Sequence, residues 1–164
     1  MSENLRRLGR GARLKAMSLC RRQDWIDAPP ERIWELVGDP NRHSQWWPRV
    51  IDVQCEGLEQ GCVYRQVYRS PMGVIETDVS VERLDDCHEL RVRCLNTGTY
   101  TRWLMTAAQG GTFIDAEFGL DPQTMRTRVF DQLAGKRYFR RWLEESLDAL
   151  ATISSEAEDR SKAS

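Results

Sequence analysis

Hydrophobic positions follow two different spacings along the chain, and the changes between them divide the sequence into regions. From residue 49 to residue 121 hydrophobic and polar residues alternate, in segments separated by short turns rich in Gly, Pro, Asn or Asp. Such alternation is typical of strands with one buried face, and turns this short join antiparallel neighbours. The expected strands are RVIDVQCEG, GCVYRQVYRS, GVIETDVSVERL, HELRVRCLN, YTRWLMTAAQ and TFIDAEFGL.

Helical spacing and one further strand flank this alternating region. Residues 16–26 predict a first strand, and APPERIWELVGDP predicts a short helix with its apolar residues on one face. NRHSQWW predicts a second short helix, which Pro48 ends. From about residue 123 to residue 153 the spacing predicts one long helix. Its apolar stripe consists of Met125, Val129, Leu133, Phe139, Leu143, Leu147 and Leu150.

This order of elements predicts an α+β fold, in which one antiparallel sheet carries its helices on one face. At 164 residues and 19.1 kDa the chain fits one domain, large enough to bury a core without disulfides or a metal. We expect a basic flexible arm over residues 1–14, the folded domain over 15–153 and a disordered polar tail over 154–164.

Charge and cysteine content exclude several classes of protein. The formal net charge of −1 provides no overall field to gather nucleic acid, so no nucleic-acid partner is expected. The five cysteines form an odd set without a C-x-x-C pair, which argues against a disulfide framework or a zinc site. The basic start of the chain contains no continuous apolar stretch, so neither a signal peptide nor stable membrane insertion is expected. We therefore expect a cytoplasmic protein with no cofactor.

Two short motifs connect this order of elements with a known superfamily. W-I-D-A-P-P-E-R-I-W-E-L-V-G-D-P at residues 25–40 and W-W-P at residues 46–48 resemble the START-like (SRPBCC) superfamily, and most nearly its bacterial polyketide cyclase/dehydrase and lipid-transport family. The resemblance covers roughly residues 16–152. It implies a helix-grip fold, in which a curved seven-stranded antiparallel sheet wraps around the C-terminal helix. It also implies a cavity between them that holds lipids, sterols, polyketides, quinones or plant hormones.

Alternation along the strands indicates which side chains face such a cavity, because charged residues prefer the wet, convex side of the sheet. For the strand at residues 100–107 two registers remain open, and we favour Trp103 and Met105 inside over Tyr100, Arg102 and Leu104. Each inward residue is either a ligand contact or ordinary core. The candidate ligand-binding residues are Trp46, Tyr64, Gln66, Tyr68, Ile75, Thr77, Val79, Val92, Trp103, Met105, Ile114, Phe118, Leu133, Phe139 and Leu143.

Aromatic residues on the expected helices allow more than one role. Trp46 and Trp47 are neighbours on a short helix, so their side chains should diverge by roughly a hundred degrees. One should pack on the rim of the sheet, and the other could gate the cavity or stay exposed. The long helix mixes basic with aromatic residues, and i, i+4 pairing with its acidic residues favours a solvated face over contact with an acidic head group. The basic residues are Lys136, Arg137, Arg140 and Arg141.

The sequence contains no recognisable catalytic constellation. We find no G-x-S-x-G, no Gly-rich phosphate loop and no H-E-x-x-H. His43 is expected at the surface and His88 in a turn, while Asp115 and Glu117 are expected on the outward face of the last strand. The groups that a cyclase could use for proton transfer are Tyr64, Tyr68 and, in the less favoured register of the strand at residues 100–107, Arg102.

Three functions remain in view from the sequence. The first is binding or carriage of a hydrophobic small molecule, such as a lipid, a polyketide or a quinone-like compound. The second is an enzyme of the polyketide aromatase/cyclase type, with dehydratase chemistry as a variant. The third is an interaction module that binds a second copy of the chain or another protein, with residues 1–14 as the contact.

Overall fold

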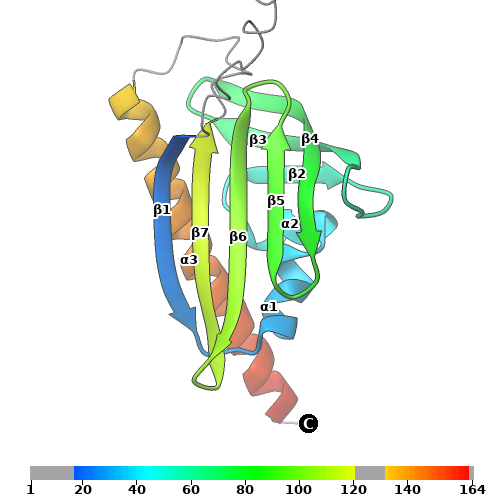
Figure 1. Cartoon of the computed structure of the whole chain (residues 1–164), viewed down its shortest axis with the longest axis vertical. Coiled ribbons are helices and arrows are strands. Elements are labelled where there is room, and N and C mark those ends of the chain that lie inside the picture. Colours follow the sequence, from blue (N-terminus) through cyan, green and yellow to red (C-terminus); the bar gives the residue numbers. More distant parts are fainter. Residues whose placement is uncertain (1–16, 121–131, 163–164) are drawn as a thin grey trace, which may run out of the picture.

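A single curved antiparallel sheet contains the strands of the described chain, in the order β1-β7-β6-β5-β4-β3-β2. The computed structural model describes residues 17–120 and 132–162. The elements are β1 (Met17–Ile26), α1 (Pro30–Val37), the 3-10 helix η1 (Pro40–Arg42), α2 (His43–Trp46), β2 (Val50–Gln54), β3 (Val63–Ser70), β4 (Gly73–Asp85), β5 (Glu89–Cys94), β6 (Thr99–Ala108), β7 (Gly111–Leu120) and α3 (Gln132–Lys162). Strands β2 to β7 form a meander, and β1 joins it by pairing with β7 (Figure 1).

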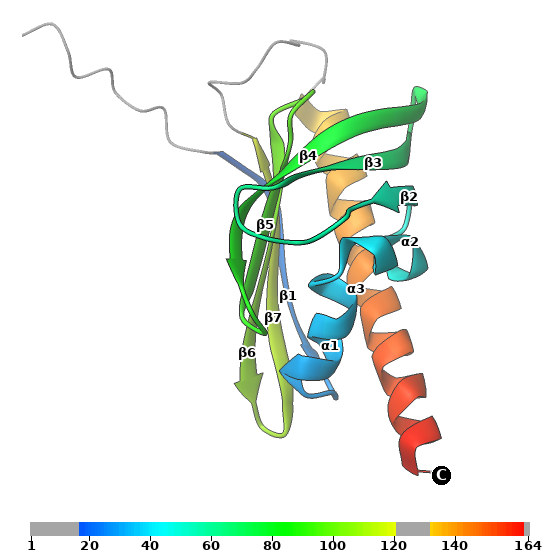
Figure 2. The same ribbon diagram turned by 90° about the vertical axis from the view of Figure 1, so that its right-hand side faces the viewer.

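The helices lie together on one face of the sheet. Figure 2 shows the long helix α3 along this face, with α1 and α2 beside it. Helix α3 packs against β1 and β7 of the sheet and against both short helices. The α+β class, the seven-stranded sheet, the two short helices after the first strand and the long C-terminal helix are therefore confirmed. Among the described residues, no helix is long and apolar enough to cross a membrane.

Local sequence explains why α1 forms between β1 and the turn that follows. Pro30 occupies the first helical turn, where its missing N–H costs nothing, and Glu31 favours the positive end of the helix. Ile33, Leu36 and Val37 are buried against the core. The Gly38 N–H donates to the Trp34 carbonyl and closes the last turn. The helix thereby covers one end of the inner sheet face.

The short helix α2 ends one residue earlier than its sequence suggests. Trp47 has an extended backbone with ψ of 101°, so the helical rotation between neighbouring side chains does not apply to it. The rings of Trp46 and Trp47 are stacked, with centroids 5.6 Å apart and planes 5° apart. The predicted divergence of these two side chains is therefore wrong. Both indoles point toward the core.

Helix α3 differs from its predicted extent at the C-terminal end. The expected disordered tail from residue 154 is instead helical as far as Lys162, and Ser154 is buried. The polar residues of this segment pair along the helix, as Ser155 does by donating to the Ala151 carbonyl. The expected arm over residues 1–14 lies outside the described residues, as do Met125 and Val129 of the predicted stripe.

Candidate functional site

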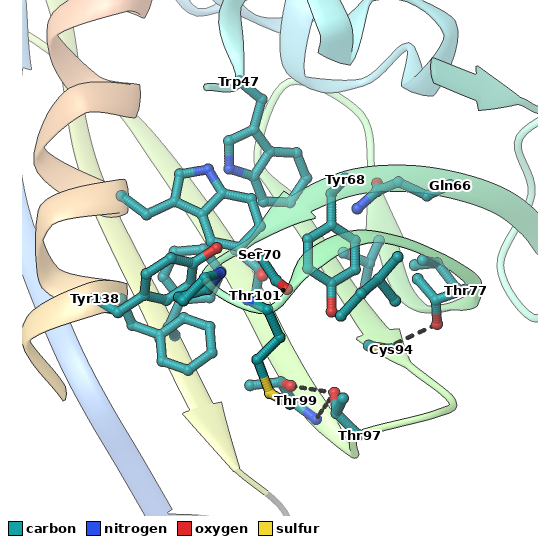
Figure 3. Close-up of a pocket in the computed structure, with 18 residues that line it drawn as sticks. Trp47, Gln66, Tyr68, Ser70, Thr77, Cys94, Thr97, Thr99, Thr101 and Tyr138 are labelled. Atoms are coloured by element: carbon teal, nitrogen blue, oxygen red, sulfur yellow. Dashed lines mark hydrogen bonds between the residues drawn. The ribbon is translucent and has the colours of Figure 1, made fainter. Parts of the chain in front are cut away.

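A cavity of about 360 Å³ lies between the inner face of the sheet and α3. Strands β3 to β7 provide its floor, α3 and Trp47 provide its roof, and the β3–β4 and β5–β6 turns provide one end (Figure 3). The lining residues are Trp47, Gln66, Tyr68, Ser70, Pro71, Met72, Ile75, Thr77, Val79, Val92, Cys94, Thr97, Thr99, Thr101, Phe118, Tyr138, Phe139 and Trp142. Most of these side chains present carbon atoms, so the cavity is predominantly apolar.

An aromatic cluster forms the wall on the α3 side. Trp142 is its centre, with ring centroids 5.1 Å from Phe118, 5.7 Å from Trp47 and 5.9 Å from Tyr68. Phe139 extends the cluster by packing 5.2 Å from Phe118. Aromatic contacts at these distances are favourable beyond the area they bury, and they hold the rings in place. The wall is therefore a preformed apolar surface.

A small number of polar atoms interrupt this apolar lining. Three side chains that line the cavity each carry a buried polar atom without a hydrogen-bond partner in the described residues: Gln66 Oε1, Trp47 Nε1 and Trp142 Nε1. Thr77 and Cys94 satisfy each other, with Oγ1 and Sγ 3.1 Å apart (Figure 3). A buried polar atom without a partner is costly, so these three atoms favour a bound molecule with its own donors and acceptors.

The titratable groups near the cavity are not suited to proton transfer near neutral pH. Burial raises the pKa of Tyr68 to about 12, so its hydroxyl stays protonated. In the described chain, no carboxylate and no histidine lines the cavity. Asp115 faces the other side of the sheet, where hydrogen bonds from Arg21 and Gln23 lower the pKa of its carboxyl. Glu117, on that same side, accepts a hydrogen bond of 2.7 Å from the Tyr100 hydroxyl.

The position of His43 corrects a sequence-based expectation. Its side chain is fully buried rather than at the surface. The imidazole packs edge-on against the rings of Trp46 and Trp47. Nε2 lies 2.9 Å from the Val37 carbonyl oxygen, and burial lowers the pKa of the imidazole to about 4. His43 is therefore a neutral core residue that does not line the cavity. His88 lies in the β4–β5 turn, with Nδ1 3.0 Å from the Met105 carbonyl.

The structure brings eight of the predicted site residues together at the cavity and places six others in the core. The predicted residues that line the cavity are Gln66, Tyr68, Ile75, Thr77, Val79, Val92, Phe118 and Phe139. Those that are buried without lining it are Trp46, Tyr64, Trp103, Met105, Ile114 and Leu143. Leu133 lies in the first turn of α3, and its side chain is outside the described residues.

Trp46 and Trp103 show why the second group lies away from the cavity. The Trp46 Nε1 donates to the Leu36 carbonyl at 3.0 Å, and its ring packs edge-on against Trp103 at 5.3 Å. Together with Trp47, they fill the end of the inner face that α1 and α2 cover. The same face of the sheet is thus solid core at one end and hollow at the other.

Several lining residues were missed by sequence reasoning, although signals for some were present. Thr101 shares its strand face with Trp103, two residues further on, and Tyr138 and Trp142 are one helical turn apart. The charged residues around these two aromatics favoured a solvated face, whereas Trp142 is only 4% exposed. The turn residues Ser70, Pro71, Met72 and Thr97 follow no period that could have indicated them.

The sequence matches the family model described as polyketide cyclase / dehydrase and lipid transport over residues 21–154. This match covers most of the chain, and the protein therefore belongs to that family. No curated protein matches the sequence. The fold and the cavity are consistent with membership of this family.

Solved structures show the same fold at low sequence identity. A START superfamily protein from Mycobacterium smegmatis has a TM-score of 0.71 and 13% identity, over 87% of this chain and 99% of that chain. A Chromobacterium violaceum protein has a TM-score of 0.65 and 17% identity, over 82% and 96%. The di-domain ARO/CYC protein StfQ from the steffimycin biosynthetic pathway has a TM-score of 0.64 and 14% identity, over 87% and 52%. Likeness at these identities establishes the fold alone.

Proposed function

We propose that this protein binds and carries a hydrophobic small molecule, of the lipid, polyketide or quinone-like class, in the cavity between the sheet and α3. The observation that carries the proposal is an apolar cavity of about 360 Å³, of whose lining side chains three carry a buried polar atom without a partner in the described residues. Its volume falls within the range of roughly 300–1,000 Å³ typical of small-molecule sites. Apolar walls supply affinity for such a ligand, and the few polar atoms orient it.

The geometry gives less support to the cyclase alternative. Of the groups that this alternative named, only Tyr68 lines the cavity. Tyr64 is buried elsewhere in the core. Arg102 donates from Nε to Glu89 at 2.7 Å on the opposite side of the sheet. Binding without chemistry therefore remains the better proposal for this site.

The state of the cysteines supports carriage inside a reducing compartment. All five cysteines are free thiols in the structure. Disulfides are rare where glutathione keeps thiols reduced. We propose the cytoplasm as the place of action on this basis.

Native mass spectrometry of the freshly purified protein, followed by solvent extraction, tests the carriage directly. We expect a stoichiometric adduct of a few hundred daltons. A bare protein mass, together with failure to take up a panel of lipids, polyketides and quinones, would contradict the proposal. It would favour an interaction module that binds a second copy or another protein.

A matched pair of variants then locates the bound molecule. Gln66→Leu removes an amide, whose Oε1 has no partner in the described residues, from the cavity lining, and we expect it to weaken binding of an oxygen-bearing ligand by about tenfold. Tyr64→Phe removes a buried hydroxyl from the same strand, outside the lining, and should leave affinity unchanged. Both affinities are measured by titration calorimetry. Equal losses in the two variants would place the ligand elsewhere.

A further inference from the structure

A cleft lined by four arginines adjoins the cavity on the β3 side of α3. It measures about 420 Å³ and draws its residues from the entry to β2, the end of β3 and α3. We call it the arginine cleft; its lining residues are Arg49, Arg69, Ser70, Pro71, Arg137, Tyr138 and Arg141. Basic residues from three separate elements thus converge on one concave surface.

The positive charge of the arginine cleft is only partly neutralised. Glu145 pairs with Arg49 at 3.3 Å and with Arg141 at 2.8 Å, so one carboxylate serves two guanidinium groups. Arg69 and Arg137 form no ion pair with any described residue. The cleft therefore carries an excess of guanidinium groups, whose planar donors match the oxygens of a carboxylate or a phosphate.

Arg49 is held in a conformation that presents it to this cleft. Its backbone φ of 76° lies in the left-handed region, and its carbonyl accepts a hydrogen bond of 2.7 Å from the Arg69 N–H. Its guanidinium carbon lies 4.3 Å from the centre of the Tyr138 ring. Nη1 is buried and has no hydrogen-bond partner in the described residues. A strained backbone and an unsatisfied buried donor together indicate an interaction that the protein alone does not complete.

The arginine cleft and the apolar cavity are continuous. Ser70, Pro71 and Tyr138 line both of them. Tyr138 stands at the junction, and its hydroxyl donates to the Arg69 carbonyl at 3.0 Å. Figure 3 shows Tyr138 and Ser70 among the side chains that line the cavity. A molecule bound in the cavity can therefore place one end among the arginines.

We propose that the carried molecule is an anionic amphiphile, with a carboxylate or phosphate head in the arginine cleft and its apolar part in the cavity. This inference rests on the proposed function and narrows its ligand class. The head group accepts hydrogen bonds from Arg49 and the neighbouring guanidinium groups, while the aromatic wall contacts the chain. Neutral lipids of the same length gain only the second of these interactions.

Matched probes that differ only in the head group test the proposal. Decanoate, decyl phosphate and decanol are titrated into the full chain, with binding followed by calorimetry and by the fluorescence of the cavity tryptophans. We expect both anions to bind at least about tenfold more tightly than decanol, the gain that one charge-assisted hydrogen bond supplies. Raising the salt concentration should weaken the anions and leave decanol unchanged, because salt screens exposed charges.

Variants of the arginines identify the head-group site. The double variant Arg137→Gln/Arg141→Gln and the single variant Arg49→Gln should each lower affinity for decanoate by about tenfold, with decanol unaffected. Arg140→Gln removes one positive charge from the same helix outside the cleft, and should behave as wild type. The double variant alters exposed positions, so it remains informative if Arg49→Gln fails to fold.

The outcomes separate this inference from the proposed function. If decanol binds as tightly as decanoate, or if Arg140→Gln matches the double variant, the head-group site is refuted while carriage stands. If no probe binds, both proposals fail. Binding of the protein to phosphatidylglycerol vesicles that is lost in the double variant, with decanoate affinity unchanged, would instead assign the arginines to a membrane surface and overturn the proposal.

Discussion

Burial, more than residue type, decides what the polar side chains beneath α3 can do. The imidazole of His43 has a pKa of about 4 and is neutral at neutral pH, because it is enclosed by indole rings. The Tyr68 hydroxyl has a pKa of about 12 and keeps its proton for the same physical reason. Neither group can exchange a proton readily near neutral pH.

The buried His43 predicts a specific dependence of stability on pH. The unfolded chain takes up a proton on this imidazole below a pH of about 6.5, whereas the folded chain resists protonation down to about 4. Stability from His43 is therefore complete above pH 6.5 and is lost as the pH falls toward 4. Urea unfolding should show a loss of about 2 kcal/mol between pH 7 and pH 5.

Replacement of each histidine provides the control for this prediction. His43→Gln keeps a donor for the Val37 carbonyl but cannot be protonated, so most of the loss between pH 7 and pH 5 should disappear. His88→Gln removes the other histidine, which lies in a turn. This variant should still lose stability between pH 7 and pH 5. The assignment to His43 is wrong if the two variants show the same pH dependence as each other.

At the scale of the elements, Gly119 explains why an outward-facing residue is buried. Tyr100 lies on the outer side of the sheet, yet it is only 4% exposed. Its ring lies across Gly119 of the neighbouring strand, and the Arg91 guanidinium carbon lies 4.1 Å from the ring centre. A Cβ at position 119 would overlap the ring. The packing of the Tyr100 ring against β7 therefore depends on glycine at position 119.

Gly119→Ala should accordingly destabilise the fold by about 1–3 kcal/mol, because the Tyr100 ring must move out of its packed position. Gly57→Ala is the matched control, since a Cβ there meets no atom within 4 Å. Urea unfolding measures both. In a Tyr100→Ala background the cost of Gly119→Ala should shrink, and an undiminished cost would show that the ring is not the cause.

The elements also show how far the sequence alone could lead. Alternation predicted the strands and their inner faces. When the charged residues of a strand all lie on one face, that face must point to solvent, and the other face must point inward. Val79 and Val92 follow this rule. The helices were harder. Charged neighbours obscured Trp142, whose burial depends on the approach of Trp47 from another element. The end of α2 at Trp46 was not predictable from the spacing of apolar residues, because it depends on the extended backbone conformation of a single residue, Trp47. That conformation stacks two indole rings that a continued helix would separate.

At the scale of the whole molecule, the position of the cavity along the inner face depends on how the helices pack on the sheet. The sequence of any one segment does not determine this packing. Two-residue periodicity identifies a face, but it does not say which part of that face another element covers. Tyr64 and Gln66 share a strand face, and only Gln66 lines the cavity. The short helices and their tryptophans fill one end of the face, and the cavity occupies the other end, beneath α3.

Because one part of the inner face is packed and another part lines the cavity, we expect the same substitution to have different effects at two paired valines. Val92 lines the cavity, and its direct cross-strand partner Val81 is buried without lining it. Val92→Phe can place its ring in the cavity, so we expect it to abolish uptake of decanoate and leave the melting temperature unchanged or higher. Val81→Phe has no such space and should destabilise the fold by about 1–3 kcal/mol.

Thermal unfolding and calorimetric titration of both variants decide the matter, because the two substitutions are chemically identical and lie on neighbouring strands. The contrast depends on the cavity being real space in the folded protein. Equal destabilisation by both phenylalanines would mean that this space is closed in solution. Unimpaired uptake by a stable Val92→Phe variant would mean that the ligand binds elsewhere. Loss of uptake with stability preserved would show that the fold leaves this space unfilled in order to hold its ligand, since filling it costs the protein nothing else.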